Sequence, residues 1–279
     1  MNSGLDWNDI EHNFRKRLIS EEKSRATVEK YVRDIHVFLD FLGERPVSKI
    51  ETISYKKYLT ERYAPASVNS MIASLNSFMK FIGREECTVR TLKIHRQTFR
   101  SEEKELTKNE MQQLVKAAGN TRMSLVIRTV CGTGIRVSEL RYITAEAVKE
   151  GRAVIHCKNK TRVILIPQAV KKILALYIRK EAISSGPVFI TKSGKPLDRR
   201  NIWRDMKSLC KKAGVSPHKV FPHNLRHLFA RTFYRAEKDI VKLADLLGHS
   251  NINTTRVYTA ETGSEHMMRL ERVEKILIT

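Results

Sequence analysis

The chain has 279 residues, and its 52 Lys and Arg residues against 30 Asp and Glu residues give a formal net charge of +22. A hydrophobic content of 41% excludes a disordered basic tail, and no segment approaches the roughly 18–20 apolar residues of a membrane span. The first residues lack the apolar core of a signal peptide. The excess of positive charge predicts a polyanionic partner, with nucleic acid ahead of an anionic membrane, and the alternative is a soluble protein that is merely basic.

Residues 1–84 have the hydrophobic period of a small all-helical domain. Apolar residues recur at helical spacing in four stretches, of which the third, around 53–63, is short. Gly43 and Gly83 follow the second and fourth stretches, as glycines at helix C-termini do, and Pro65 suits the first turn of the fourth helix. We therefore expect four helices here.

The segment 85–105 interrupts this pattern, because it is polar and charged and has no sustained period. We expect it to be a linker between two domains. Thr107 and Glu110 then form the capping-box pattern that begins a helix. A second domain is accordingly expected over 106–279.

One part of the second domain has a β pattern. The runs 152–157 and 162–166 are rich in β-branched residues, and the polar turn 158–161 between them predicts a hairpin with lysines at its tip. A third short run, 187–191, is also β-rich, whereas residues 198–278 again have a helical pattern. The expected fold class is mainly α: a small all-helical N-terminal domain, then an α+β domain that is mostly helical with a small antiparallel sheet.

The positive charge is concentrated in the second part of the chain. Residues 1–84 contain fourteen basic and eleven acidic residues, a net of +3, which leaves +19 for residues 85–279. If the partner is nucleic acid, the linker and the second domain supply most of the attraction, although many of these lysines only solvate helix surfaces.

Five local features of the second domain are candidates for chemistry, and each alone has an ordinary structural explanation. Arg136 follows two glycines near the start of a helix, where a guanidinium beside free backbone N–H groups can bind a phosphate. Lys158 and Lys160 lie at the hairpin tip and can reach a leaving oxygen, or simply face solvent. His223 and Arg226 are three residues apart and share a helix face.

The last two features lie near the C-terminus. His249 follows Gly248, which ends one helix, and Ser250 or Asn253 can cap the next helix. Tyr258 is expected near the end of that next helix. The amphipathic tail 265–277 predicts a helix that packs on its own domain or docks on a neighbouring subunit.

Together these residues can break a phosphodiester bond without a metal ion. Two guanidiniums can hold the non-bridging oxygens as negative charge develops, a tyrosine can be the nucleophile, and a lysine or histidine can move protons. The four cysteines lie far apart without a CxxC pair, which argues against a disulfide framework and a zinc site. We expect no metal and no cofactor.

The boxes GTGIRVSEL, HNLRH and LLGHSNINTTRVYT, with the hairpin lysine between the first two, resemble the signature of the tyrosine recombinases, the phage-integrase family. The resemblance extends over the whole chain. By resemblance, 1–84 is the helical core-binding (DNA-binding) domain, 85–105 the linker, and 106–279 the catalytic domain with its C-terminal helix at 265–277.

The resemblance implies six catalytic residues, and these are Arg136, Lys158, His223, Arg226, His249 and Tyr258. The two arginines would clamp the scissile phosphate, with His249 hydrogen-bonded to it. Tyr258 would attack, giving a 3′-phosphotyrosine and a free 5′-hydroxyl, while His223 accepts the tyrosine proton and Lys158 protonates the leaving oxygen.

Two further points concern the residues next to this set. Glu139 resembles the family's acidic residue after the first arginine, more a supporting than a catalytic group. The family often has Lys-Gly-Asn-Lys at the hairpin, and here one residue fewer separates Lys158 from Lys160. Counting along the first strand favours Lys158, and counting back from the second strand leaves Lys160 open.

The implied function is site-specific DNA recombination, independent of metal and ATP, in the integration, excision or resolution of DNA. The partners would be double-stranded DNA with a specific recombination site and three further protomers in a tetramer, with a partner recombinase or accessory protein left open and no membrane. The expected location is the bacterial cytoplasm, at the nucleoid.

Little chain precedes the first predicted helix for an arm-site-binding domain, so the resemblance is to the compact, Xer-like enzymes. Two alternatives remain at this point: a type IB topoisomerase with the same cleavage and religation chemistry, and a non-catalytic DNA-binding protein.

Overall fold

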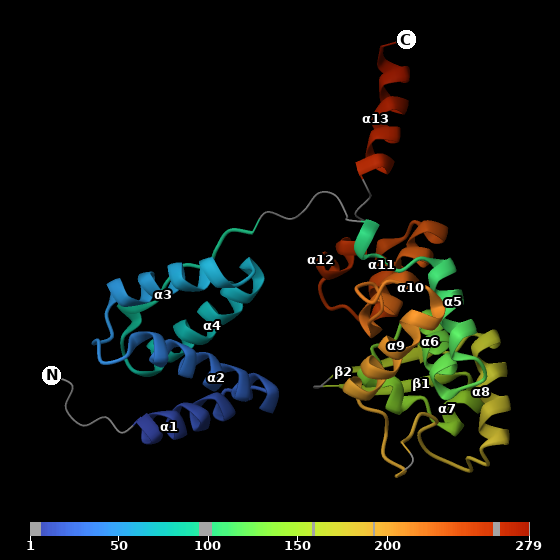
Figure 1. Ribbon diagram of the computed structural model, residues 1–279, viewed down its shortest axis with the longest axis horizontal. Coiled ribbons are helices and arrows are strands. Elements are labelled where there is room, and N and C mark those ends of the chain that lie inside the picture. Colours follow the sequence, from blue (N-terminus) through green and yellow to red (C-terminus); the bar gives the residue numbers. More distant parts are fainter. Residues whose placement is uncertain (1–6, 95–101, 158–159, 192, 259–262, 279) are drawn as a thin grey trace. The chain divides into compact units, whose positions relative to one another are not determined.

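The structure is a computed structural model that describes residues 7–94, 102–157, 160–191, 193–258 and 263–278. The chain divides into two compact units, 1–96 and 97–279. Both consist mostly of helices, and the second also has a two-stranded sheet (Figure 1).

Between residues 7 and 94, the first unit contains four α-helices and one 3₁₀ turn. Their bounds are α1 Trp7–Ser20, α2 Arg25–Leu42, α3 Lys49–Arg62, α4 Pro65–Phe81 and η1 Glu85–Cys87. Ser24 and Ser48 cap α2 and α3 with their hydroxyl groups, and Pro65 begins α4. Gly43 ends α2 with φ +58°, a conformation that glycine adopts without strain.

The core of the first unit is rich in aromatic residues. The rings of Phe14 and Phe78 meet edge to face with centroids 5.3 Å apart, and Phe38 and Tyr55 do so at 5.0 Å. Cys87 and Val89, which follow the fourth helix, are buried in the same core. The buried carboxylate of Asp34 pairs with Lys30 and accepts a hydrogen bond from Ser74, so its charge is compensated.

The second unit is larger. Its elements are η2 Glu102–Lys104, α5 Lys108–Ala118, α6 Arg122–Thr133, η3 Val137–Tyr142, α7 Ala145–Glu150, β1 Arg152–Cys157, β2 Lys160–Leu165, α8 Gln168–Lys180, α9 Arg199–Ala213, α10 Pro222–Glu237, α11 Ile240–Leu247, α12 Ile252–Thr255, η4 Arg256–Tyr258 and α13 Gly263–Leu277. The capping box of Thr107 and Glu110 is present at the start of α5. Helix α6 packs against α5, α8, α9 and α10, so it lies at the centre of this unit.

The sheet is a tight antiparallel hairpin. Cys157 of β1 pairs with Lys160 of β2, which leaves residues 158–159 between the strands. Ala153, Ile155, Ile164 and Ile166 are buried, whereas Val154, Val163 and Leu165 are exposed. One face of the hairpin therefore covers the core of the second unit.

Three local expectations differ from the structure. The segment 187–191 makes only isolated bridges, Thr144 with Pro187 and Ile190 with Pro196, because its neighbours are single residues and not strands. Lys160 begins β2 and is not part of the turn. Asn251, and not Ser250 or Asn253, caps α12, with its side chain accepting from the backbone N–H of Asn253.

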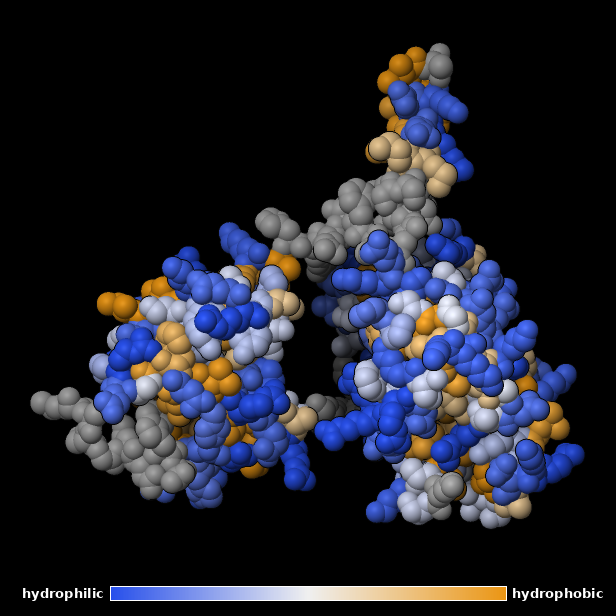
Figure 2. Space-filling model, viewed as in Figure 1, coloured by the Kyte–Doolittle hydropathy of each residue, from blue (hydrophilic) through white to orange (hydrophobic). Residues whose placement is uncertain are grey.

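Helix α13 has a row of exposed apolar side chains. Met267, Leu270, Val273, Ile276 and Leu277 are each at least half exposed. Figure 2 shows hydrophobic and polar residues side by side along this helix. An amphipathic helix of this kind has a face that would be buried if another surface covered it.

Candidate active site

The first element of the site is the turn between α6 and η3. Gly134 ends α6 in the left-handed region, with φ +66°, and a Cβ at this position would lie 2.3 Å from the ring of Phe229. Only glycine fits here, because both the backbone conformation and the approach of the ring exclude a side chain. The turn places Arg136 at the start of η3 with its side chain 45% exposed, so the guanidinium is open to an incoming anion.

Glu139 binds both the backbone and the side chain of Arg136. Its Oε2 accepts a hydrogen bond from the Arg136 backbone N–H at 2.7 Å, and its Oε1 accepts one from Arg136 Nη1 at 3.0 Å. Arg162 of β2 also donates to Glu139 Oε2. One buried carboxylate therefore faces two guanidiniums, and the cluster retains positive charge for a phosphate.

Arg226 is the second arginine, and it lies in α10 with a relative exposure of 1%. Its Nη1 donates to the carbonyl oxygen of Gly134 at 2.5 Å, and its Nη2 donates to that of Leu247 at 2.7 Å. Burial, with the nearby charge of Arg136 added to it, lowers the pKa of Arg226 to about 10. The group is still cationic at neutral pH and is fixed between α6 and α11.

His249 lies directly after α11, against Arg226. Its Nε2 is 3.1 Å from Arg226 Nη2, and its Nδ1 is 2.9 Å from the hydroxyl oxygen of Thr255. Because the guanidinium can only donate, Nε2 is the acceptor and Nδ1 carries the proton in this state. Burial and the charges of Arg226, Arg136 and Arg162 lower the pKa of His249 to about 4, so the ring is neutral at pH 7.

Tyr258 lies in η4 and is 4% exposed. Its ring packs edge to face on His227 with centroids 4.9 Å apart, and it lies nearly parallel to the ring of His249 at 6.2 Å. Tyr258 belongs to a small buried cluster with Ala230 of α10 and with Leu243 and Leu247 of α11. Tyr258, the expected nucleophile, thus lies beside His249, which accepts a hydrogen bond from Arg226.

His223 and His227 are one helical turn apart on α10, and their ring centroids are 4.3 Å apart. Burial, followed by the charges of Arg226, Arg136 and Arg199, lowers the pKa of His223. A neutral imidazole can accept a proton. In this conformation the ring of His223 contacts His227, and the ring of His227 contacts Tyr258.

The structure thus brings four of the six expected residues, Arg136, Arg226, His249 and Tyr258, into one cluster, with His223 at its edge. Lys158 lies outside the described residues. Lys160 opens β2 opposite Cys157, next to the hairpin connection.

Sequence reasoning overlooked Arg162 and Thr255. Arg162 has a signal in the strand alternation, since it shares a face with the buried Ile164 and Ile166. A charged residue in a buried row needs a partner, which here is Glu139. Thr255 is completely buried on the short helix α12, and no spacing rule distinguishes it from the exposed Thr254 beside it.

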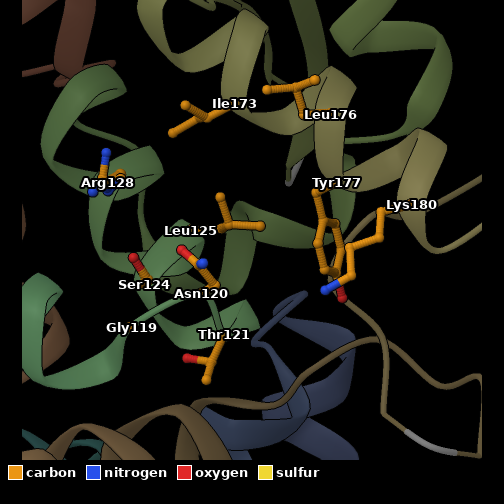
Figure 3. Close-up of a pocket in the computed structure, with 10 residues that line it drawn as sticks. All are labelled: Gly119, Asn120, Thr121, Ser124, Leu125, Arg128, Ile173, Leu176, Tyr177 and Lys180. Atoms are coloured by element: carbon orange, nitrogen blue, oxygen red, sulfur yellow. The ribbon is translucent and has the colours of Figure 1, made fainter.

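A separate hollow of about 290 Å³ lies between α6 and α8, where Leu125, Ile173 and Leu176 line it together with Arg128 and Lys180 (Figure 3). None of the site residues above lines it. Within the described residues, no three His, Cys, Asp or Glu side chains are placed to hold a metal ion. Of the helices described, none is long and apolar enough to cross a membrane.

Two family models match the chain. Residues 104–265 match the phage integrase family, and residues 12–86 match the phage integrase N-terminal SAM-like domain. The first match alone covers more than half of the 279 residues.

Curated relatives match over nearly the whole chain. Tyrosine recombinase XerA of Pyrococcus horikoshii is 30% identical over 276 residues, which cover 96% of this chain and 93% of the relative. Tyrosine recombinase XerD of Oceanobacillus iheyensis is 26% identical, with 91% of this chain and 93% of the relative covered.

Solved structures are similar in fold. A crystal structure of XerA recombinase has 26% identity and a TM-score of 0.52, over 96% of this chain and 99% of that one. A lambda integrase tetramer bound to a Holliday junction has 19% identity and a TM-score of 0.72, over 92% of this chain and 78% of the other. XerH bound to its difH substrate before cleavage has 17% identity and a TM-score of 0.67, over 99% of this chain and 85% of the other.

Proposed function

This chain belongs to the phage integrase family and is a tyrosine recombinase of the Xer type, and from that premise we propose how its residues cut and rejoin DNA. The enzyme is a site-specific recombinase that cleaves DNA strands through a covalent 3′-phosphotyrosine. The relatives that match nearly the whole chain are named tyrosine recombinases, and this does not favour the topoisomerase or the non-catalytic alternative.

The observation that carries the residue assignment is the convergence of two arginines, a neutral histidine and a buried tyrosine. Arg136 and Arg226 would bind the two non-bridging oxygens of the scissile phosphate. The exposure of the Arg136 side chain supports this role, and so do the hydrogen bonds that fix Arg226. His249 would complete the clamp by a hydrogen bond to the phosphate.

The reaction is a transesterification in which atoms and charge balance. The Tyr258 oxygen forms a bond to phosphorus, and the bond from phosphorus to the 5′-oxygen breaks. The phenolic proton passes to His223, whose lowered pKa keeps it neutral and able to accept, and Lys158 protonates the leaving 5′-oxygen. The phosphotyrosine conserves the bond for religation, so the step needs no ATP and no metal.

The two parts of the chain have separate roles in this proposal. Residues 1–84 are the core-binding domain, which grips the DNA, and 106–279 form the catalytic domain. In the linker 85–105 that joins them, Cys87 and Val89 pack into the core of the first unit. The charge indicates that the linker and the catalytic domain supply most of the attraction to DNA, since +19 of the net +22 lies after residue 84. Salt-dependent attraction to the phosphate backbone follows from that excess.

The substrate is double-stranded DNA with a specific recombination site, and four protomers act together on two duplexes. The lambda integrase tetramer on a Holliday junction and the XerH complex with difH support this assembly for a protein of the same fold. The exposed apolar side chains of α13 are suited to dock on a neighbouring protomer. We place the enzyme in the cytoplasm, at the nucleoid, where its substrate lies.

A nicked suicide duplex tests the assignment of the nucleophile. Duplexes enriched from a random-sequence pool by binding to the protein would supply the site, and a nick beside the scissile phosphate would trap the covalent adduct in EDTA. We expect wild-type protein to form the adduct and Tyr258→Phe to bind the duplex without forming it. An adduct with Tyr258→Phe would show that another residue attacks.

A further inference from the structure

Arg162 of β2 is a half-buried charge that the catalytic set does not include. It lies on the inward face of the hairpin, in the row that continues with the buried Ile164 and Ile166, and its side chain is 17% exposed. A guanidinium in such a row costs free energy unless its donors are paired. Its hydrogen bonds connect it to residues of the candidate active site.

The first contact is with Glu139. Arg162 Nη2 donates to Glu139 Oε2, and the same oxygen accepts the backbone N–H of Arg136 at 2.7 Å. The other carboxylate oxygen holds Arg136 Nη1 at 3.0 Å. Since Glu139 is 4% exposed, water does not replace a lost partner easily, and Arg162 determines how the carboxylate is oriented toward Arg136.

The second contact is with the end of α11. Arg162 Nη1 donates to the carbonyl oxygen of Leu246 at 3.2 Å, and the next carbonyl, of Leu247, accepts from Arg226 at 2.7 Å. The Arg162 side chain also fills the space over Gly248, where a Cβ would lie 2.5 Å from its Cδ. One side chain thus joins the hairpin, the Arg136 turn and the turn that carries His249.

We propose that Arg162 is a positioning residue for strand cleavage. It holds Glu139, and through Glu139 it fixes the position of Arg136 relative to Arg226 and to the turn that carries His249. This inference rests on the proposed function, in which Arg136 binds the scissile phosphate. Arg162 itself need not touch DNA. Without it, Glu139 keeps Arg136 as its hydrogen-bonded ion-pair partner and draws that guanidinium away from the phosphate.

The test is single-turnover formation of the covalent adduct on the nicked duplex at saturating protein. Arg162→Met removes both donors and the charge, and we expect adduct formation to slow by about 100-fold, the effect of a misplaced catalytic group, with DNA affinity within about threefold of wild type. Arg152→Met is the matched control, because Arg152 lies on the same hairpin with an exposed side chain. It should cleave at the wild-type rate.

A substrate change separates positioning from loss of fold. A methylphosphonate at the scissile position has one non-bridging oxygen replaced by methyl and carries no charge, so it depends less on Arg136. The loss in Arg162→Met should shrink to less than about tenfold on this substrate. Combining Arg162→Met with Glu139→Gln should give a variant no slower than the slower single variant, because both act on Arg136.

Arg162→Lys carries the same test if the methionine variant fails to fold. Lysine keeps the charge but cannot span Glu139 and Leu246, and we expect a loss of about tenfold that the methylphosphonate again reduces. Wild-type cleavage by either folded variant, equal losses on both substrates, or losses that multiply in the double variant would overturn the role of Arg162. The proposed function would stand in each case, as long as wild type forms the adduct and Tyr258→Phe does not.

Discussion

The Nδ1 atom of His249 lies 2.9 Å from the hydroxyl oxygen of the buried Thr255. With Arg226 donating to Nε2, the ring carries its proton on Nδ1 and donates to that hydroxyl. To donate to a phosphate from Nε2, the ring must take the other tautomer, in which Nδ1 accepts. A hydroxyl can donate as well as accept, so Thr255 can support both states.

Thr255→Val tests this pairing. Valine has nearly the shape of threonine but neither donates nor accepts, so we expect adduct formation to fall by about tenfold, the value of one hydrogen bond of about 1.4 kcal/mol. The measurement is the single-turnover rate on the nicked duplex. Thr254→Val, at the exposed neighbouring position, should react like wild type, and equal rates for the two variants would remove Thr255 from the proposal.

The neutral state of His249 predicts how stability depends on pH. Its pKa falls from 6.5 to about 4 on folding, because of burial and the charges of Arg226, Arg136 and Arg162. Between these values the unfolded chain binds a proton that the folded chain does not. This contribution to stability is therefore complete above pH 6.5 and is lost as the pH falls toward 4.

Thermal melts at about pH 7.5, 5.5 and 4.5 check the direction of this pH dependence, because these values lie on either side of about 6.5 and near 4. We expect the fall in Tm with acidification to be smaller in His249→Asn than in wild type. His218→Asn changes an exposed histidine and should leave the wild-type slope unchanged. A His249→Asn variant with the full wild-type slope would contradict the prediction.

The choice between Lys158 and Lys160 can be made chemically. A 5′-bridging phosphorothiolate has a sulfur leaving group that needs no protonation, so it bypasses a general acid. We expect Lys158→Ala to lose about 100-fold or more on the normal phosphodiester and to recover on the thiolate. Recovery confined to Lys160→Ala would assign the proton to Lys160 instead.

The apolar side of α13 predicts a requirement for assembly. Val273 is 50% exposed, and Val273→Asp would place a charge on the surface that we expect to dock on another protomer. We expect binding to one duplex to be kept, while formation of a synaptic complex with two duplexes and recombination fall at least about tenfold, as measured by native gel. Arg272→Gln changes the net charge by the same amount on the same helix and should retain both.

Much of the fold can be read from local patterns in the sequence. Gly43 ends α2, Pro65 begins α4 and the Thr107–Glu110 box begins α5, because caps depend on residues adjacent in the chain. The expected run 187–191 forms no strand, since a strand exists only where another segment pairs with it. Sequence alternation indicates an extended chain but does not provide the partner.

By itself, the sequence determined the excess of basic residues, the helical character of both parts and the motif boxes whose resemblance to the tyrosine recombinases indicates Arg136, Arg226, His249 and Tyr258. Only the tertiary structure decided that Arg226 is buried between the Gly134 and Leu247 carbonyls, that Arg162 reaches Glu139, and that Thr255 rather than Thr254 supports His249. The physical reason is that these contacts depend on how separate elements pack together, and those of Arg226 and Arg162 join residues far apart in the chain. Their hydrogen bonds and shifted pKa values depend on burial and on neighbouring charges, which local sequence does not encode.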